Sequence, residues 1–392
     1  MSRRIICHLQ FFRAFLLLGF ITACTPVSTY TVKTTSESHN LFNDALMGEP
    51  VSVPELKQLF VLSDNQKTEF LTALHHPDSR EELVIESIYR YLKTRLDNFN
   101  FHADTLTAEQ TLAQNAGNCL SLAILTKALT DISPAGIYFE LARTPSVYQR
   151  ENGYSLSSQH IQTVIYEKSP HRFYSSKPQR ITIDYYSTLG SRTLRRVSSK
   201  EFYAMFYSNR AAEALIHGEN QIAYWYLKEA IRIDDENLIA INLLAVLYQN
   251  LNLEEYAERA FIYGLSFAKD QMELLSNYHR FLVSQGRDDE AQVVLTVLDD
   301  YDDPDPFKWI DLADQKLIDK NYRAAIKYYQ KANERASYLH QPYAGMAKAY
   351  FYLGQNIKAE NAIKHAIEQS YDVQFTSAYK AKYNYFKSKH RQ

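Results

Sequence analysis

Two stretches of the chain, KNYRAAIKYYQKANER (320–335) and GQNIKAENAIKHAIEQ (354–369), align with each other without a gap when Lys320 is placed on Gly354. Alanine occupies the same place in both stretches, at Ala325 and Ala359. The same spacing leads back along the chain through the series Ala223, Ala257, Ala291, Ala325 and Ala359. Self-similarity at a fixed period indicates a repeat architecture.

Three further positions follow this period. A turn position carries Gly218, Asn252, Gly286, Lys320 and Gly354; a core position carries Leu227, Phe261, Leu295, Tyr329 and Ile363; a third position carries Ala230, Gly264, Leu298, Ala332 and Ala366. The period predicts five helix-turn-helix units over residues 204–373, and residues 374–392 have the length and polarity of a capping helix. The pattern resembles the tetratricopeptide repeat, whose period is about 34 residues.

The first helices of these units are expected to line a groove that binds a peptide or protein partner. The period places Asn242, Gln249, Asn250, Ser276, Arg280, Asp314 and Lys348 toward that groove. This lining is polar and mixed in charge, and it lacks the basic cluster that would clamp an acidic peptide. We therefore expect an extended partner held by hydrogen bonds or by tyrosine side chains.

The acidic stretch DDYDDPDP (residues 299–306) does not fit a calcium-binding loop, because it has no glycine at the sixth position and has proline where ligands should alternate. Asp305 before Pro306 instead has the order of a helix N-cap followed by a favoured first helical residue. We expect no metal and no cofactor.

The first residues are typical of a secretory signal peptide over residues 1–23, with Arg3, Arg4 and Arg13 in a positive n-region and a short apolar run from Ala14 to Ala23. Its end, Ile21-Thr22-Ala23-Cys24, resembles the lipobox of bacterial lipoproteins, which implies cleavage before Cys24 and lipidation of its thiol. By the same resemblance, Thr25 favours the outer membrane. An unmodified secretory signal with a chance cysteine is the alternative.

Residues 24–50 are predicted to be the lipidated cysteine and a flexible tether, with order beginning near Leu41, because residues 25–40 are rich in Ser and Thr and have no apolar period. Loss of three arginines with the leader moves the net charge from −2 to −5, which does not favour a nucleic-acid partner. We expect a lipid-anchored protein on the bacterial outer membrane that faces the periplasm.

Residues 51–200 are predicted to form an α+β domain. Apolar residues recur at helical spacing from about Val51 to Asn100, a capping box starts at Thr107, and a buried helix begins near Asn118. Three alternating stretches follow at residues 136–142, 160–167 and 180–187 and predict strands. Helices followed by strands are typical of an α+β fold.

Cys119 lies in the first turn of that buried helix, and it is the only cysteine outside the leader and lipidation site. A helix N-terminus and a nearby imidazolium would lower the pKa of its thiol, as a nucleophile requires. His160 at the start of one strand and Asp184 within another are candidates for the base and its orienting group.

The order Cys119, His160, Asp184 resembles the transglutaminase-like superfamily, as does the G-x-C-x-x-x-small pattern from Gly117 to Ala123. Gln162 and Tyr185 depart from the better-known members, which carry an aromatic residue and a proline there. The resemblance implies a papain-related N-terminal domain in which Cys119 attacks an amide carbonyl, His160 moves the proton and Asp184 orients the ring.

The sequence analysis therefore predicts a transglutaminase-like α+β domain followed by an all-α repeat superhelix. Its leading functional hypothesis is a periplasm-facing cysteine peptidase, amidase or acyltransferase with a partner-binding repeat array. The alternative is a non-catalytic adaptor that acts through the repeats alone. A buried structural role for Cys119, and zinc bound by Cys119, His160 and Asp184, remain further alternatives.

Overall fold

The computed structural model describes residues 41–75, 83–102, 104–143, 148–151, 154–157, 160–168, 179–185, 192–267, 272–299 and 305–390. The predicted signal peptide, Cys24 and the first part of the tether lie outside these residues. None of the helices described is both long enough and apolar enough to span a bilayer.

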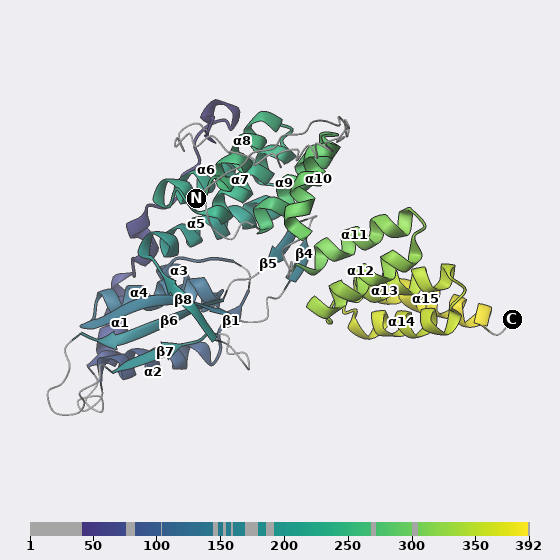
Figure 1. The fold of residues 1–392 in the computed structure, drawn as a ribbon. Helices are drawn as coiled ribbons and strands as arrows, with labels where there is room; N and C mark the ends of the chain where they lie inside the picture. Colours follow the sequence, from purple (N-terminus) through teal and green to yellow (C-terminus); the bar gives the residue numbers. More distant parts are fainter. Residues whose placement is uncertain are drawn as a thin grey trace, which may run out of the picture. The chain divides into compact units, whose positions relative to one another are not determined.

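Four helices open the α+β region: α1 (Asp64–Leu74), α2 (Val84–Leu96), α3 (Ala108–Gln114) and α4 (Cys119–Asp131) (Figure 1). The capping box predicted at Thr107 is present, since its hydroxyl accepts from the Gln110 amide and the Gln110 side chain returns to the Thr107 amide. Asn115 ends α3 with φ of 47°, in the left-handed region. These local signals separate α3 from α4 and set where α4 begins.

The main sheet has the strand order β7-β6-β3-β8, and every neighbouring pair is antiparallel. Its strands are β3 (Ala135–Arg143), β6 (His160–Glu167), β7 (Arg180–Ile183) and β8 (Arg192–Val197). Helix α4 packs against β6 and β3 (Figure 1). The strand predicted over 180–187 ends at Ile183, so Asp184 follows the strand instead of lying inside it.

Four short strands complete this region: β1 (Asn100–Phe101) pairs in parallel with β2 (Ala116–Gly117), and β4 (Tyr148–Glu151) forms a hairpin with β5 (Tyr154–Ser157). The sequence analysis predicted neither these strands nor β8. Strand β8 was missed because it is an edge strand with little apolar alternation: Val197 is buried, whereas the side chains of residues 193–196 are exposed.

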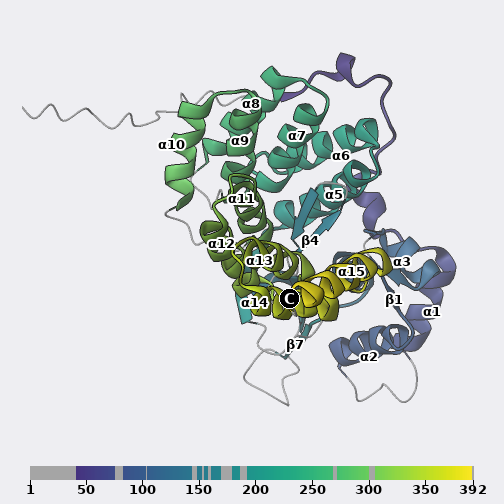
Figure 2. The ribbon, with the colours of Figure 1, turned by 90° about the vertical axis from the view of Figure 1, so that its right-hand side faces the viewer.

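The repeats form as predicted, in five helix pairs (Figures 1 and 2). The pairs are α5 (Ser199–Ile216) with α6 (Asn220–Ile233), α7 (Leu238–Asn250) with α8 (Glu254–Leu265), α9 (Met272–Ser284) with α10 (Asp288–Asp299), α11 (Pro306–Ile318) with α12 (Tyr322–Arg335), and α13 (His340–Tyr352) with α14 (Asn356–Gln369). All five alanines of the period are buried on second helices. The turn residues have φ between 54° and 75° in every pair.

The predicted capping helix is α15 (Val373–His390), which packs on α14. Its Tyr379 and Phe386 are buried in a core that also contains Tyr329 and Ile363. This second core belongs to α11–α15, whereas the core of the first three pairs is continuous with that of the α+β region. The ten repeat helices are thus stabilised by two cores.

Helix α5 begins at Ser199 and therefore spans the boundary predicted between residues 200 and 204. The hydroxyl of Ser198 caps this helix by accepting from the Glu201 amide. Phe202 then stacks on Phe139 of β3, with ring centroids 3.6 Å apart. The first repeat helix is therefore also part of the α+β core.

Residues 41–50 lie inside the predicted tether range but beyond the point near Leu41 where order was expected to begin, and they pack on the repeats. The side chain of Leu41 is buried, and its carbonyl oxygen accepts from the Tyr248 hydroxyl at 2.7 Å. Asp44 accepts from the Tyr224 hydroxyl and is paired with Lys228. These partners are far away in the chain, and for that reason local composition did not reveal them.

Candidate functional site

The N-terminus of α4 is built from a short run of small and polar residues. Gly117 has φ of 137°, and a Cβ there would meet Ser121 at 2.8 Å, so glycine is required. The Asn118 side chain caps the helix by accepting from the Ser121 amide at 2.9 Å. Cys119 is therefore the first residue of α4, where backbone amides lack helical partners.

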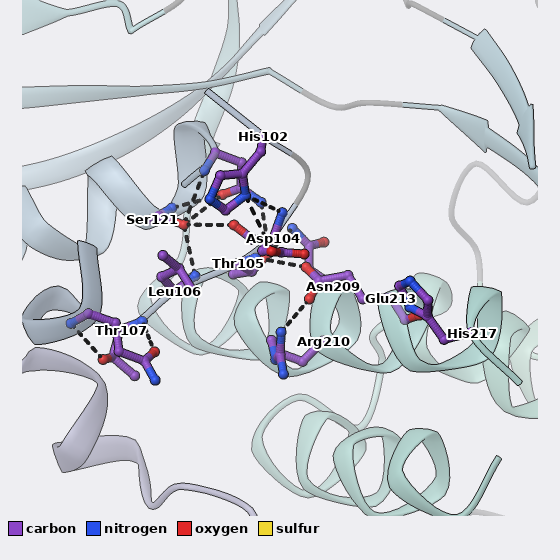
Figure 3. A network of polar contacts seen from close by, with 12 residues as sticks. His102, Asp104, Thr105, Leu106, Thr107, Ser121, Asn209, Arg210, Glu213 and His217 are labelled. Atoms are coloured by element: carbon purple, nitrogen blue, oxygen red, sulfur yellow. Dashed lines mark hydrogen bonds and ion pairs between the residues drawn. The ribbon is translucent and has the colours of Figure 1, made fainter. Parts of the chain in front are cut away.

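A polar network links this helix start to α5 (Figure 3). The Ser121 hydroxyl accepts from the Leu106 amide at 2.9 Å, and the Asn118 side chain donates to the Thr105 hydroxyl at 2.8 Å. The Thr105 amide donates to Glu213 of α5 at 2.8 Å. Burial raises the pKa of the Glu213 carboxyl, while its contacts with Thr105 and with Arg210 oppose that shift. The first repeat helix thus helps to hold the segment that covers the start of α4.

His160 and Asp184 meet, as their placement on two neighbouring strands predicted. The ring Nε2 of His160 donates to Oδ1 of Asp184 at 2.5 Å, and the Gln162 side chain donates to Oδ2 at 2.8 Å. The side chains of His160 and Gln162 are both buried. Sequence analysis noted Gln162 only as a departure from the family pattern; its position two residues after His160, on the same strand face, is the signal that could have identified it as a partner of Asp184.

The thiol of Cys119 is half-buried, and its electrostatic surroundings differ from those predicted. Burial raises its pKa to about 11, the negative charge of Asp184 adds to the increase, and a backbone hydrogen bond opposes it. The predicted lowering of the pKa is wrong for this state of the protein. Desolvation and a neighbouring carboxylate outweigh the favourable position at the helix N-terminus.

Within the described part of the chain, no hydrogen bond connects the Cys119 sulfur to the His160 ring. The described residues also contain no group of three His, Cys, Asp or Glu side chains able to hold a metal ion. Cys119, His160 and Asp184 therefore do not converge as a zinc ligand set. His160 and Asp184 form a hydrogen-bonded pair. The Cys119 thiol is separate from this pair but close enough for Asp184 to affect its pKa.

The predicted partner-binding residues lie on first helices of their pairs. Asn242, Gln249 and Asn250 are on α7, Arg280 is on α9 and Lys348 is on α13. Asn250, Arg280 and Lys348 are exposed, whereas Asn242 and Gln249 are half-buried. We call the side of α7, α9, α11 and α13 that carries these residues the first-helix surface.

One residue of the first-helix surface was missed. Asn277 of α9 donates from its side chain to the Asn242 oxygen at 2.8 Å, and it accepts from Arg280. It lies next to Ser276, the residue that the period placed toward the groove. The sequence signal that could have identified Asn277 is the run of polar residues on α9 that also contains Ser276. Together, Asn242, Asn277 and Arg280 form a polar chain from α7 to α9.

The paired helices have the architecture of tetratricopeptide repeats. Their fixed period, buried alanines and left-handed turn residues show this architecture within the chain itself. No model of a known protein family matches the chain, and no curated protein matches it.

Several solved structures are similar to part of the chain. PilF from Pseudomonas aeruginosa has 17% identity and a TM-score of 0.38, covering 49% of this chain and 100% of its own. PilW, described as a type IV pilus biogenesis factor, has 17% identity and a TM-score of 0.35, covering 46% and 91%. YrrB, described as a repeat protein with an unusual peptide-binding site, has 16% identity and a TM-score of 0.31, covering 45% and 92%.

Proposed function

We propose that this protein binds a peptide or protein segment on its first-helix surface and acts as an adaptor. The observation that carries the proposal is the polar chain formed by Asn242, Asn277 and Arg280 across two successive first helices. Asparagine amides and guanidinium groups supply the donors and acceptors that an extended backbone needs. Repeat arrays present such side chains along an extended surface.

Apolar contact area lies beside these polar groups. Ile239 of α7 and Val283 of α9 are exposed, although both are large hydrophobic residues. A partner would desolvate them while its backbone pairs with the polar chain. The combination of polar and apolar side chains supports binding of a folded or extended polypeptide.

A photo-cross-linking residue placed at Val283 tests this proposal, with the same residue at Val293 of α10 as the control. Both valines are exposed and belong to one repeat, but Val293 lies on the second helix. In the organism that produces the protein, we expect a partner adduct from position 283 and none from position 293. Arg280→Glu should then remove the adduct. Equal adducts from both positions, or none from either, would contradict the proposal.

A second candidate function is thiol-dependent acyl chemistry, and the 2.5 Å contact between His160 and Asp184 favours it. A carboxylate on Nε2 fixes the ring tautomer and leaves the lone pair of the neutral imidazole on Nδ1. We propose that this is a transglutaminase-like domain in which Cys119 would lose its proton to His160 and attack an amide carbonyl. The C–N bond would break, the leaving amine would take the proton, and water or another amine would resolve the thioester.

The adaptor ranks ahead of the enzyme because the thiol is not activated in this state. Catalysis needs the His160 imidazole to approach Cys119. It also needs the pKa of the Cys119 thiol to fall from about 11. Ammonia release from glutamine-containing peptides tests the second candidate, with Cys119→Ser and His160→Ala as paired variants. Ammonia release by the wild type that both variants abolish would support this second candidate. Equal release by the wild type and the two variants would exclude it.

We also propose that a lipid on Cys24 anchors the protein to the bacterial outer membrane, facing the periplasm. The charged leader, the apolar run and the Ile21-Thr22-Ala23-Cys24 sequence support this. Cys24→Ala should move the protein from the membrane fraction to the soluble periplasmic fraction. Membrane retention of that variant would show that the lipid is not the anchor.

A further inference from the structure

Helix α15 continues the register of the first helices beyond the fifth repeat. Arg280, Asp314, Lys348 and Lys382 follow one another at the repeat period, on α9, α11, α13 and α15. Tyr379 and Phe386 face the core on the buried side of α15, whereas Lys382 is exposed. The capping helix therefore adds a fifth helix to the first-helix surface of α7, α9, α11 and α13.

Large apolar side chains recur near the ends of these helices. Ile318 of α11 is 73% exposed, Tyr352 of α13 is 53% exposed, and Tyr385 of α15 is 51% exposed. Ile318 and Tyr352 are equivalent positions of the repeat period, and Tyr385 directly precedes the next equivalent position, Phe386. Single exposed apolar residues are ordinary on a protein surface. Ile318, Tyr352 and Tyr385 nevertheless give each of α11, α13 and α15 one exposed apolar side chain that a partner can cover, although Phe386 itself is buried.

The same surface carries positive charge. The sequence of α15 contains no acidic residue, and Lys380 and Lys382 are exposed on it. Among the described residues, neither Lys348 nor Lys382 forms an ion pair, and both are exposed to a partner, although the Lys382 ammonium lies 5.9 Å from the centroid of the Tyr379 ring. Asp314, the one acid in the series at the repeat period, accepts a hydrogen bond from the Tyr329 hydroxyl. The sequence analysis found no basic cluster because it did not include α15 in the surface.

We propose that the surface of α11, α13 and α15 formed by Ile318, Lys348, Tyr352, Lys382 and Tyr385 binds an acidic peptide segment that carries apolar side chains. This rests on the proposed adaptor function and specifies its partner. The two lysines would pair with carboxylates, while Ile318, Tyr352 and Tyr385 would cover the apolar side chains. A segment of polypeptide fits a surface laid out along successive helices better than a bilayer does, because three scattered apolar residues give little insertion.

Fluorescence anisotropy with the complete protein tests the proposal. The probe is a labelled twelve-residue peptide in which Glu alternates with Leu or Phe, and the control peptide has Gln in place of Glu. We expect the acidic peptide to bind about tenfold more tightly than the Gln peptide, and its affinity to fall as salt rises.

Matched variants locate the site. The charge-removing pair Lys348→Gln with Lys382→Gln should weaken binding about tenfold, since each exposed ion pair contributes modestly. The control pair Lys327→Gln with Lys358→Gln removes two exposed lysines from the second helices α12 and α14, and should change affinity less than about twofold. Ile318→Ser should also weaken binding, whereas Ile357→Ser on α14 should not.

This inference would be overturned by equal binding of the acidic and Gln peptides, by equal loss in both lysine pairs, or by preferential binding of anionic vesicles through Lys348 and Lys382. Concentration-dependent self-association that disappears in the Lys348/Lys382 variant would assign the surface to a second copy of the chain and so overturn it as well. If the adduct at position 283 persists while the acidic peptide fails to bind, this inference falls and the adaptor function stands. If there is neither an adduct at position 283 nor binding of the acidic peptide, this inference and the adaptor function both fall.

Discussion

Nε2 of His160 and Oδ1 of Asp184 lie 2.5 Å apart, although 24 residues separate them in the chain. The antiparallel pairing of β6 with β7 brings them together, and Gln162 donates to the second carboxylate oxygen. The pair is complete without the thiol. The carboxylate of Asp184 would orient a catalytic imidazole, but its negative charge also disfavours the Cys119 thiolate.

Alkylation of Cys119 should be slow at pH 7 and should accelerate up to about pH 11, because burial and Asp184 raise the pKa of the thiol to about 11. Asp184→Asn removes the negative charge, lowers this pKa and should speed labelling at pH 8 to 9. The measurement uses protein in which Cys7 and Cys24 are replaced by Ser, and the denatured chain, with a thiol pKa of about 8.5, is the reference. Fast labelling of the native protein at pH 6 would show that a charged imidazole reaches the sulfur.

The repeats could be predicted because their stabilising residues recur locally. Ala325 and Ala359 are buried at equivalent places, and Asn252 and Lys320 take the same left-handed turn as the glycines of the other pairs. By contrast, β8 and the packing of residues 41–50 depend on partners distant in sequence. Val197 pairs with Phe139, and Leu41 contacts Tyr248.

The candidate site likewise has one part that could be predicted from the sequence and one part that depends on tertiary packing. The expected antiparallel pairing of two neighbouring strands was enough to bring His160 and Asp184 together, although Asp184 directly follows β7 instead of lying inside it. The pKa of Cys119 was predicted in the wrong direction, because helix position is a local property whereas burial is a tertiary one. The thiol environment therefore required the packed structure.

Glu213 should make the stability of the protein depend on pH in the range just above the ordinary glutamate pKa of about 4.3. Burial raises its pKa in the folded state, so the folded protein binds the proton more tightly than the unfolded chain. Its contribution is thus fully present below the unfolded pKa and is lost as pH rises through the folded pKa. The free energy of unfolding of the wild type minus that of Glu213→Gln should fall as pH rises.

Chemical denaturation at several pH values measures this difference. Glu213→Ala is the contrasting variant, since it leaves the Thr105 amide without its carboxylate acceptor and should cost about 1–3 kcal/mol. A difference between wild type and Glu213→Gln that grows with pH would show that the folded state favours the ionised carboxyl.

Docking of residues 41–50 on the repeats should contribute to stability. Leu41 is 2% exposed and Leu46 is 47% exposed, so the two leucines of this segment provide a matched comparison. Leu41→Ala should reduce the free energy of unfolding by up to about 2–3 kcal/mol and speed proteolysis of the segment, whereas Leu46→Ala should do neither. Equal behaviour of the two variants would mean that the segment does not remain docked in solution.

Lys320→Gly should stabilise the protein. Lys320 has φ of 59° at a turn where Gly218, Gly286 and Gly354 occupy the equivalent positions. The left-handed region costs a side-chain-bearing residue about 1–2 kcal/mol, and the greater freedom of glycine in the unfolded chain offsets about 0.5–1 kcal/mol of the gain. We therefore expect thermal or chemical unfolding to show a net gain of up to about 1.5 kcal/mol. Lys327→Gly, inside α12, should instead cost about 1 kcal/mol, because glycine is a poor helix former. A loss of stability in Lys320→Gly would mean that the lysine side chain makes a contact that outweighs its backbone strain.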